Sequence, residues 1–157
     1  MARVTRSRRI AADSGRVWEL VSDPHSLPRW WPRAQRVEDV REPDSGTRAR
    51  WTVVLETERG TGVRADYRCV RAEYRRRYAW EQEIEGTPFE RIIHGSGLEI
   101  ELTATHRETE VAMTSDERLR GLSRLGSTMI RGAAKRRLDE ALDGIERALV
   151  GEPESAA

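Results

Sequence analysis

The sequence predicts an α+β fold in which an antiparallel sheet packs against one long C-terminal helix. Between residues 34 and 118, apolar and polar side chains alternate, which is the period of half-buried β-strands. From Leu122 to Leu149, apolar residues instead recur every three or four positions, as they do on one face of an α-helix. This helix needs an apolar partner, and the inner face of the sheet is the candidate that the sequence offers.

The segment before residue 34 is predicted to hold one strand and two short helices. Residues 3–10 alternate weakly and can form the first strand. Asp13 or Ser14 can cap the helix that follows. The second helix begins where Asp23 precedes a proline, the residue favoured at the first helical position. It must be brief, because further prolines at 28 and 32 interrupt it.

Five later segments alternate most clearly, and each is predicted to be a strand: 47–58, 63–72, 77–85, 91–106 and 109–117. Glycines at 60, 62 and 86 and the Arg107-Glu108 pair separate these segments and are predicted to form hairpin turns. Strands that follow one another through such turns pair antiparallel. The whole sheet is therefore predicted to be antiparallel.

Length and charge limit the number of domains and the classes of partner. The chain has 157 residues, with 28 Lys and Arg against 27 Asp and Glu, so its formal net charge is +1. This length suits a single domain, predicted over residues 1–150 and followed by a disordered tail at 151–157. A near-neutral chain is a poor nucleic-acid binder, because phosphate contacts require a basic surface. We therefore expect no nucleic-acid partner.

The sequence also predicts a cytoplasmic protein without stable membrane insertion. It has no run of about 18 apolar residues, and its basic N-terminus lacks the apolar stretch of a signal peptide. A single cysteine, Cys69, excludes an internal disulfide and a multi-cysteine metal site. The histidines at 25, 94 and 106 are scattered and form no metal-binding motif. No metal or other cofactor is expected.

The order of elements and one short stretch carry a family resemblance. Residues 17–32, VWELVSDPHSLPRWWP, follow the first predicted strand. This stretch resembles the signature of the polyketide cyclase/dehydrase and lipid-transport subgroup of the SRPBCC superfamily, the START-like helix-grip proteins. The resemblance extends over roughly residues 3–150. It implies a curved sheet that grips the long helix around a hydrophobic cavity, and a ligand such as a lipid, polyketide or aromatic metabolite.

Twelve residues are candidates for lining this cavity. They combine inward-facing positions of the strands with residues near the expected mouth, and they mix bulky apolar with small or polar side chains, as ligand pockets do. The candidates are Trp30, Trp31, Trp51, Tyr67, Tyr78, Trp80, Gln82, His94, Ser96, Met113, Ser115 and Met129. One of the two adjacent tryptophans is expected to line the ligand and the other to cover the short helix. The alternative is a solid core, in which the same residues enclose only buried waters.

Catalytic candidates, if the protein is an enzyme, are His94, Tyr67 and Tyr78. A histidine can act as a general base near neutral pH, and a phenol can stabilise a developing enolate. Alternatively, His94 satisfies a backbone carbonyl, or a bulge at the neighbouring glycines turns it to the other face, and the tyrosines contribute ordinary packing. No arginine faces inward on the central strands, whereas aromatase/cyclase members often use one deep in the pocket.

Three functions remain open at this point. The first is a carrier or binding protein for a small hydrophobic molecule. The second is a polyketide cyclase/dehydratase that moves protons within the cavity. The third is a partner-binding module similar to the chaperone-activating branch of the superfamily. Arginine and glutamate dominate the outward strand positions, which argues against a large apolar interface and favours a monomer or weak homodimer.

Overall fold

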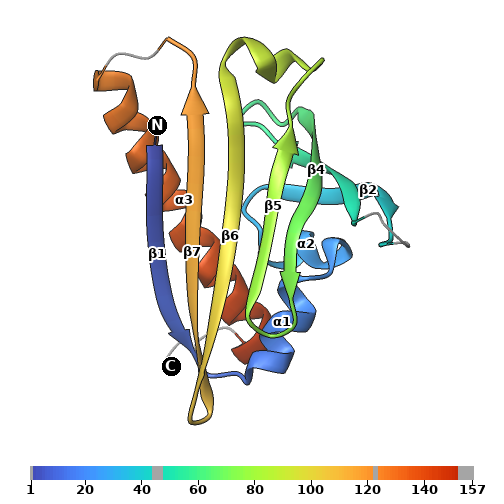
Figure 1. The fold of residues 1–157 in the computed structure, drawn as a ribbon, viewed down its shortest axis with the longest axis vertical. Coiled ribbons are helices and arrows are strands. Elements are labelled where there is room, and N and C mark those ends of the chain that lie inside the picture. The colour runs from blue at the N-terminus through green and yellow to red at the C-terminus, as the bar shows by residue number, and fades with distance from the viewer. Residues whose placement is uncertain (1, 44–47, 122–123, 152–157) are drawn as a thin grey trace.

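Seven strands form one antiparallel sheet in the order β1-β7-β6-β5-β4-β3-β2, in a computed structural model that describes residues 2–43, 48–121 and 124–151. The strands are β1 (Ala2–Ile10), β2 (Ala34–Arg41), β3 (Arg50–Glu56), β4 (Gly62–Glu73), β5 (Arg77–Glu83), β6 (Ile93–Thr105) and β7 (Glu108–Leu119). Figure 1 shows the first strand, β1, beside the last, β7. The predicted antiparallel sheet is confirmed.

The helices follow the predicted order. They are α1 (Ser14–Val21), the 3₁₀ helix η1 (Pro24–Ser26), α2 (Leu27–Trp30), the 3₁₀ helix η2 (Pro88–Arg91) and α3 (Arg124–Val150). Asp13 caps α1 by accepting hydrogen bonds from the backbone N–H of Gly15 at 2.8 Å and of Arg16 at 3.1 Å. Asp23 caps η1 in the same way, through the N–H of His25 at 3.0 Å. Both capping carboxylates therefore begin helices as predicted.

Several boundaries differ from the prediction. Pro28 does not interrupt α2 but lies in its first turn, where the missing N–H needs no partner. The alternation of β2 is broken by an irregularity between Glu38 and Arg41, where Asp39 has a φ of 50°. For this reason the sequence did not predict β2 as a separate strand. The long strand begins at Ile93 because η2 precedes it. The predicted tail beyond Gly151, and residues 122–123 at the predicted helix start, lie outside the described residues.

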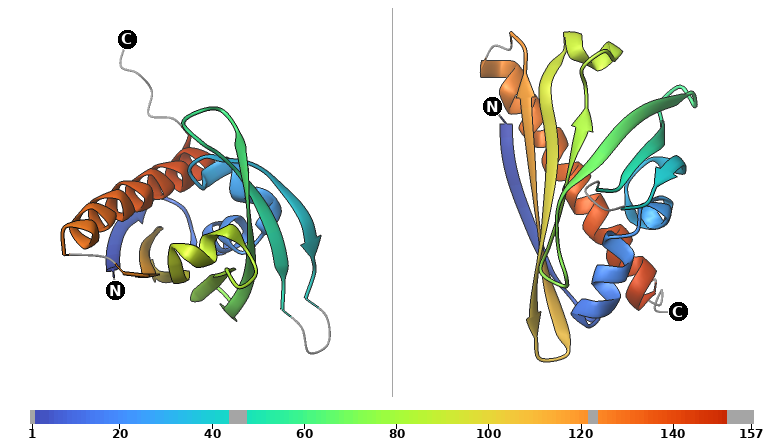
Figure 2. Two further views of the ribbon diagram at one scale, coloured as in Figure 1. Left: turned by 90° about the horizontal axis from the view of Figure 1, so that it is seen from above. Right: turned by 45° about the vertical axis from the view of Figure 1, so that its right-hand side comes forward.

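The long helix α3 crosses the concave face of the sheet, and its two halves have different surroundings. Figure 2 shows the sheet curving around α3, with α1 and α2 beside the helix's C-terminal half. In that half, Leu138, Leu142 and Ile145 are completely buried. In the N-terminal half, Ala133 and Arg137 are only partly buried. Solid packing therefore fills the lower part of the space between helix and sheet, and the upper part is less filled.

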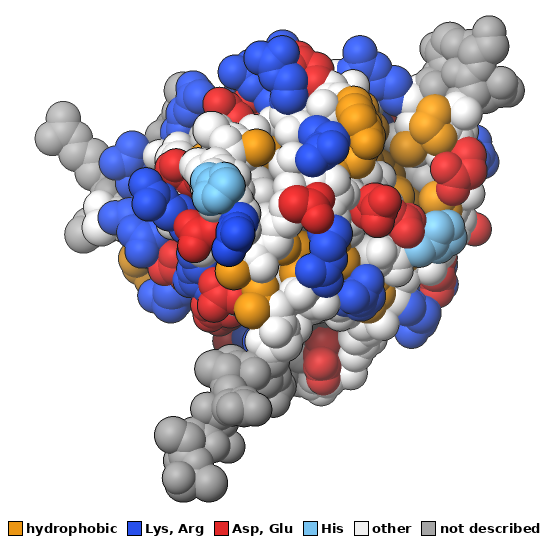
Figure 3. All heavy atoms as spheres, turned by 90° about the horizontal axis from the view of Figure 1, so that it is seen from below, with side chains coloured by type: hydrophobic (Ala, Val, Ile, Leu, Met, Phe, Trp, Pro, Cys, Tyr) orange, Lys and Arg blue, Asp and Glu red, His pale blue; other side chains and the backbone are white. Residues whose placement is uncertain are grey.

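Charged side chains of both signs cover the outer surface. On the outer face of the sheet, Arg68 pairs with Glu81 at 3.1 Å and Arg50 pairs with Glu83 at 3.4 Å. Exposed pairs of this kind add little to stability, since water and salt screen them. Figure 3 shows the lower end of the molecule, where basic and acidic side chains are interspersed with small separate apolar areas.

Candidate functional site

A cavity of about 660 Å³ lies between the upper half of the sheet and the N-terminal half of α3. This volume falls in the range of about 300–1,000 Å³ that small-molecule sites occupy. Its walls come from the inner face of β3 to β7, from α3, and from the loops after α2 and β3. Seen from above, α3, η2 and the β3–β4 hairpin surround this end of the sheet (Figure 2, left).

Several predicted residues line the cavity: Trp31, Tyr67, Trp80, Gln82, Ser96 and Ser115. Residues that the prediction missed also line it, including Leu55, Phe89, Ile93, Ala133, Glu117 and Arg137. Phe89 and Ile93 belong to η2 and the irregular start of β6, where alternation no longer indicates which side chains face inward.

Other predicted residues lie in the packed core and not on the cavity wall: Trp30, Trp51, Tyr78 and Met113. Their prediction as ligand contacts is corrected by their position, since they pack among other core side chains and none of them lines the cavity. The choice between the adjacent tryptophans is also resolved. Trp31 reaches the cavity, whereas Trp30 packs beneath α3 with 2% exposure.

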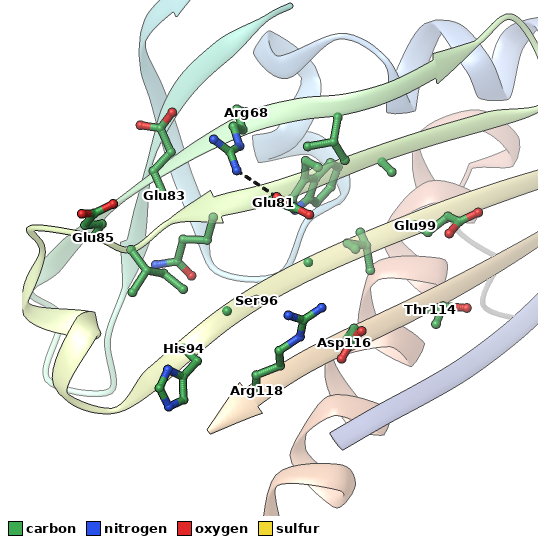
Figure 4. A pocket seen from close by; sticks show the side chains of 18 of the residues that line it. Arg68, Glu81, Glu83, Glu85, His94, Ser96, Glu99, Thr114, Asp116 and Arg118 are labelled. Atoms are coloured by element: carbon green, nitrogen blue, oxygen red, sulfur yellow. Dashed lines mark hydrogen bonds and ion pairs between the residues drawn. The ribbon is translucent and has the colours of Figure 1, made fainter. Parts of the chain in front are cut away.

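His94 does not face the cavity, so its prediction as a cavity residue is wrong and the alternative of a bulge at the neighbouring glycines is the one observed. The pairing of β6 with β7 shifts register between Ile93 and Gly95, and such a bulge reverses the facing of the residues beside it. Ile93 therefore lines the cavity, while His94 is exposed on the outer side of the sheet, as Figure 4 shows. Its location on the outer side removes it as an internal general base.

Met129 is not a cavity residue either. It lies on α3 one turn before Ala133, which does line the cavity. The Met129 side chain is nevertheless 76% exposed. The helical period correctly placed it in phase with inward residues, but this part of α3 lies beyond the region that the cavity occupies.

An aromatic cluster forms one wall of the cavity, and Trp80 is its centre. The ring centroid of Trp80 lies 5.4 Å from that of Trp31 and 6.3 Å from that of Tyr67. On its core side, the same indole contacts Trp30 and Trp51 at 6.0 Å each and Tyr78 at 6.2 Å. Edge-to-face arrangements dominate these contacts, as aromatic quadrupoles favour. Trp80 therefore joins the cavity wall to the core.

A row of polar side chains crosses the inner face of four neighbouring strands. Tyr67 on β4 is directly opposite Gln82 on β5, and Ser96 on β6 is directly opposite Glu117 on β7. The β5–β6 register pairs Glu81 with Gly97, so Gln82 and Ser96 are the next positions along. These four residues, which we call the polar row, all line the cavity. A ligand there meets a phenol, an amide, a hydroxyl and a carboxylate in line.

The polar row ends at an ion pair between sheet and helix. Arg137 of α3 donates to Glu117 with Nη1 2.8 Å from Oε1. The Glu117 side chain is only 13% exposed, so the guanidinium offsets the cost of burying its carboxylate. The sequence prediction about inward arginines covered only the central strands, and it therefore missed Arg137 on α3. Glu117, by contrast, continues the alternation of Val111, Met113 and Ser115 and could have been identified.

Within the polar row, Tyr67 is a hydrogen-bond donor at neutral pH. Burial raises the pKa of its phenol to about 12, although the positive charge of Arg137 acts to lower it. Burial also raises the pKa of Tyr78, which lies in the core. Neither phenol is therefore a base near neutral pH, whereas either can donate to an oxygen.

The raised pKa of Tyr67 predicts a loss of stability in alkali. The unfolded phenol ionises near its ordinary pKa of 10.0, below the folded value of about 12. The contribution is therefore fully present below pH 10 and is lost as pH rises toward 12. Tyrosinate absorbance measured during alkaline titration should show a late component near pH 12. Tyr67→Phe should remove that component, and an unchanged titration curve would contradict the assignment.

Within the described residues, no group of three or more His, Cys, Asp or Glu is placed to hold a metal ion. None of the described helices is long and apolar enough to cross a membrane.

Comparison with known proteins places these observations in a family. The model of the family described as polyketide cyclase / dehydrase and lipid transport matches residues 1–150. No relative was found among curated proteins.

Three solved structures illustrate the similarity of fold. A START superfamily protein from Mycobacterium smegmatis has a TM-score of 0.77 at 12% identity, with 96% of this chain and 98% of that chain covered. XoxI from Bacillus cereus has a TM-score of 0.70 at 19% identity, with 96% of both chains covered. The di-domain ARO/CYC BexL of the BE-7585A biosynthetic pathway has a TM-score of 0.74 at 16% identity. The similarity covers 96% of this chain and 50% of BexL. Identities this low indicate a shared fold and leave function to the site.

Proposed function

The chain belongs to the polyketide cyclase/dehydrase and lipid transport family, and we propose that it is a cytoplasmic carrier or binding protein for a small hydrophobic molecule. Within that class we favour an uncharged aromatic ligand that bears carbonyl or hydroxyl groups, such as an aromatic polyketide. The ligand occupies the cavity between the sheet and α3, where its rings pack against Trp31 and Trp80.

The observation that carries this proposal is the unpaired amide of Gln82. Its Nε2 is buried and has no hydrogen-bond partner among the described residues. Leaving a buried donor unpaired costs about 1–3 kcal/mol, and Gln82 lies on the wall of the cavity between Tyr67 and Ser96. A ligand carbonyl beside this amide would supply the missing acceptor. Tyr67, which stays protonated, offers a second donor to the same end of the ligand.

Replacing Gln82 by leucine should weaken binding without weakening the fold. Leucine has a similar volume but no donor, so it removes the unpaired buried group and one ligand contact together. We expect roughly a tenfold loss of affinity, equivalent to about 1.4 kcal/mol, with an unchanged or higher melting temperature. The probe is emodin, an uncharged trihydroxyanthraquinone, titrated calorimetrically.

The matched control is Gln35→Leu, the same change at an exposed position of β2. It should leave emodin affinity unchanged. If wild-type protein binds no emodin, and native mass spectrometry of freshly purified protein finds no bound small molecule, the proposal fails. A loss of affinity that is equal in both variants would remove Gln82 from the site. Binding of oleic acid but not emodin would favour a lipid ligand.

The second candidate function is a polyketide cyclase/dehydratase, and the Glu117–Arg137 pair is the observation that favours it. Such an enzyme needs a base inside the cavity. His94 faces outward, and Tyr67 remains protonated at neutral pH. Glu56, Glu58 and Glu140 also line the cavity but are exposed. The Glu117 carboxylate, at 13% exposure and in the polar row, is the candidate base. The test incubates a reactive polyketide with wild-type protein and with Glu117→Gln. If wild-type protein forms product and the variant forms none while still binding emodin, the enzyme is favoured over the carrier.

A further inference from the structure

A second hollow, of about 750 Å³, lies on the opposite, outer face of the sheet. It exists because two outward positions of β6, Gly95 and Gly97, have no side chains. Figure 4 shows Arg68 and Glu81 on one side of this stretch, and Asp116 and Arg118 on the other. The hollow is thus a polar depression in the middle of the sheet, directly behind the polar row.

The sheet is not continuous where the hollow and the cavity approach each other. Pairing between β5 and β6 ends at Glu81 and Gly97. Their outer neighbours continue further, since β4 stays paired with β5 as far as Glu83 and β7 stays paired with β6 as far as Ile93. The two strands therefore separate from each other while each remains bound on its other side. The residues that line both the cavity and the hollow surround this separation: Trp80, Gln82, Ser96, Gly97 and Leu98.

Two buried polar atoms without partners lie on either side of Gly97. One is Nε2 of Gln82, on the β5 side, and the other is Oδ1 of Asp116, which is paired in register with Gly97 on the β7 side. The first lacks an acceptor and the second lacks a donor among the described residues. Buried polar atoms usually have partners, so two orphans beside one glycine indicate a position where a polar group would be stabilised.

From this arrangement we propose that the separation between β5 and β6 connects the cavity to the outer hollow, and that the hollow is a subsite for the polar end of an elongated ligand. This inference rests on the proposed function, because the body of the ligand occupies the cavity. The polar end passes beside Gly97 and contacts Gln82 and Asp116.

Charge balance in the hollow identifies the class of that polar end. Arg68 and Arg50 are neutralised by Glu81 and Glu83. Glu99 also lines the hollow and pairs with Arg77 at 3.8 Å. The remaining charges have both signs, with Asp116 and Glu85 against Arg3 and Arg118. A strongly charged group of either sign would face like charges there. Hydroxyl groups both donate and accept without net charge, so a sugar or another polyol suits the hollow. The ligand class is therefore an aromatic glycoside.

The test compares emodin with its 8-O-β-D-glucoside in protein with an open or a filled hollow. Gly97→Val fills it with a residue that favours strands, and a Cβ there meets the backbone oxygen of Trp80 at 3.4 Å. Gly95→Val is a second filling variant, whose Cβ meets only the Arg118 side chain, at 3.7 Å. Thr103→Val is the control, at an exposed position of β6 outside the hollow.

We expect wild-type protein to bind the glucoside at least as tightly as emodin in calorimetric titrations. Gly95→Val, which lies outside the cavity, should lower glucoside affinity by about tenfold or more and change emodin affinity less than about twofold. Gly97→Val, at the separation between the strands, should lower glucoside affinity at least as much. Thr103→Val should change neither. If wild-type protein binds emodin but excludes the glucoside, or if folded filling variants weaken both ligands equally or neither, the subsite is overturned. Failure of emodin itself to bind would overturn the aromatic ligand and the subsite with it. If native mass spectrometry also finds no bound small molecule, the proposed function fails as well.

Discussion

Replacing Gly144 by alanine should destabilise the protein, although alanine is the better helix former. Gly144 lies on α3, and a Cβ built on it would collide with the backbone oxygen of Trp30 and lie 2.8 Å from its Cα. A real Cβ atom essentially never lies within 3.0 Å of another group's heavy atom, and here the neighbour is backbone, which cannot rotate away. The substitution must therefore move α2 away from α3. Overpacking of this kind costs about 1–3 kcal/mol.

The matched control is Gly132→Ala on the same helix, where the nearest atom to the new Cβ is a guanidinium nitrogen of Arg136 at 3.9 Å. This change should stabilise the helix by up to about 1 kcal/mol. Thermal melts should thus shift in opposite directions, downward by about 3–10 °C for Gly144→Ala and upward by a few degrees for Gly132→Ala. If Gly144→Ala were neutral or stabilising, α2 would not pack on α3 in this way.

The Gly144→Ala substitution should also impair binding of emodin. Trp31 follows α2 directly and lines the cavity. Displacing α2 therefore moves one of the aromatic walls, even though Gly144 does not line the cavity. A melting temperature that falls while affinity is retained would indicate that the loop after α2 adjusts independently of the helix.

The architecture was predictable because its signals are local. Alternation, helical periodicity and the capping carboxylates Asp13 and Asp23 each depend on only a few neighbouring residues. The one strand not singled out, β2, contains an irregular segment near Asp39 that breaks the alternation. Local patterns therefore predicted the regular strands and the helices of α1 to α2 and α3, but neither the irregular strand β2 nor the one-turn helix η2.

The site was predictable only in part, because its geometry depends on register. Alternation identified Tyr67, Gln82 and Ser96 as inward-facing residues, one strand at a time. Their alignment with Glu117 in one row depends on how four strands pair, which no single strand determines. A bulge of one residue at the start of β6 turns His94 to the outer face of the sheet, whereas regular alternation places it on the inner face.

The contribution of α3 to the site was the least predictable. Helical periodicity indicates which face of α3 points toward the sheet, but not whether that face meets packed core or open cavity. Leu138 is completely buried, whereas its neighbour Arg137 reaches the cavity and pairs with Glu117. Met129, in phase with Ala133, is exposed. These differences follow from the curvature of the sheet, which depends on the whole chain.

Replacing Trp80 by alanine should have the largest effect on both stability and binding. The indole is 5% exposed and contacts five other aromatic rings: Trp30, Trp31, Trp51, Tyr67 and Tyr78. Truncating a buried tryptophan costs about 3–5 kcal/mol, which is a large share of the roughly 5–15 kcal/mol that stabilises a domain. Denaturant titration should therefore show a much lower midpoint, and emodin should no longer bind.

A stability loss this large could itself abolish binding, so two further variants separate the roles. Trp80→Phe keeps an aromatic ring in the cluster and should restore most of the stability while leaving emodin affinity reduced, since the smaller ring covers less of the cavity wall. Trp31→Ala should cost less stability, because Trp31 is only partly buried, yet it also removes an aromatic wall. Because the two indoles contact each other edge to face, with ring centroids 5.4 Å apart, they form one wall. A ligand ring packed against that wall should lose affinity when either indole is changed. Full affinity in folded Trp31→Ala and Trp80→Phe would place the ligand away from the aromatic wall, beside the ion pair of Glu117 and Arg137 at the end of the polar row.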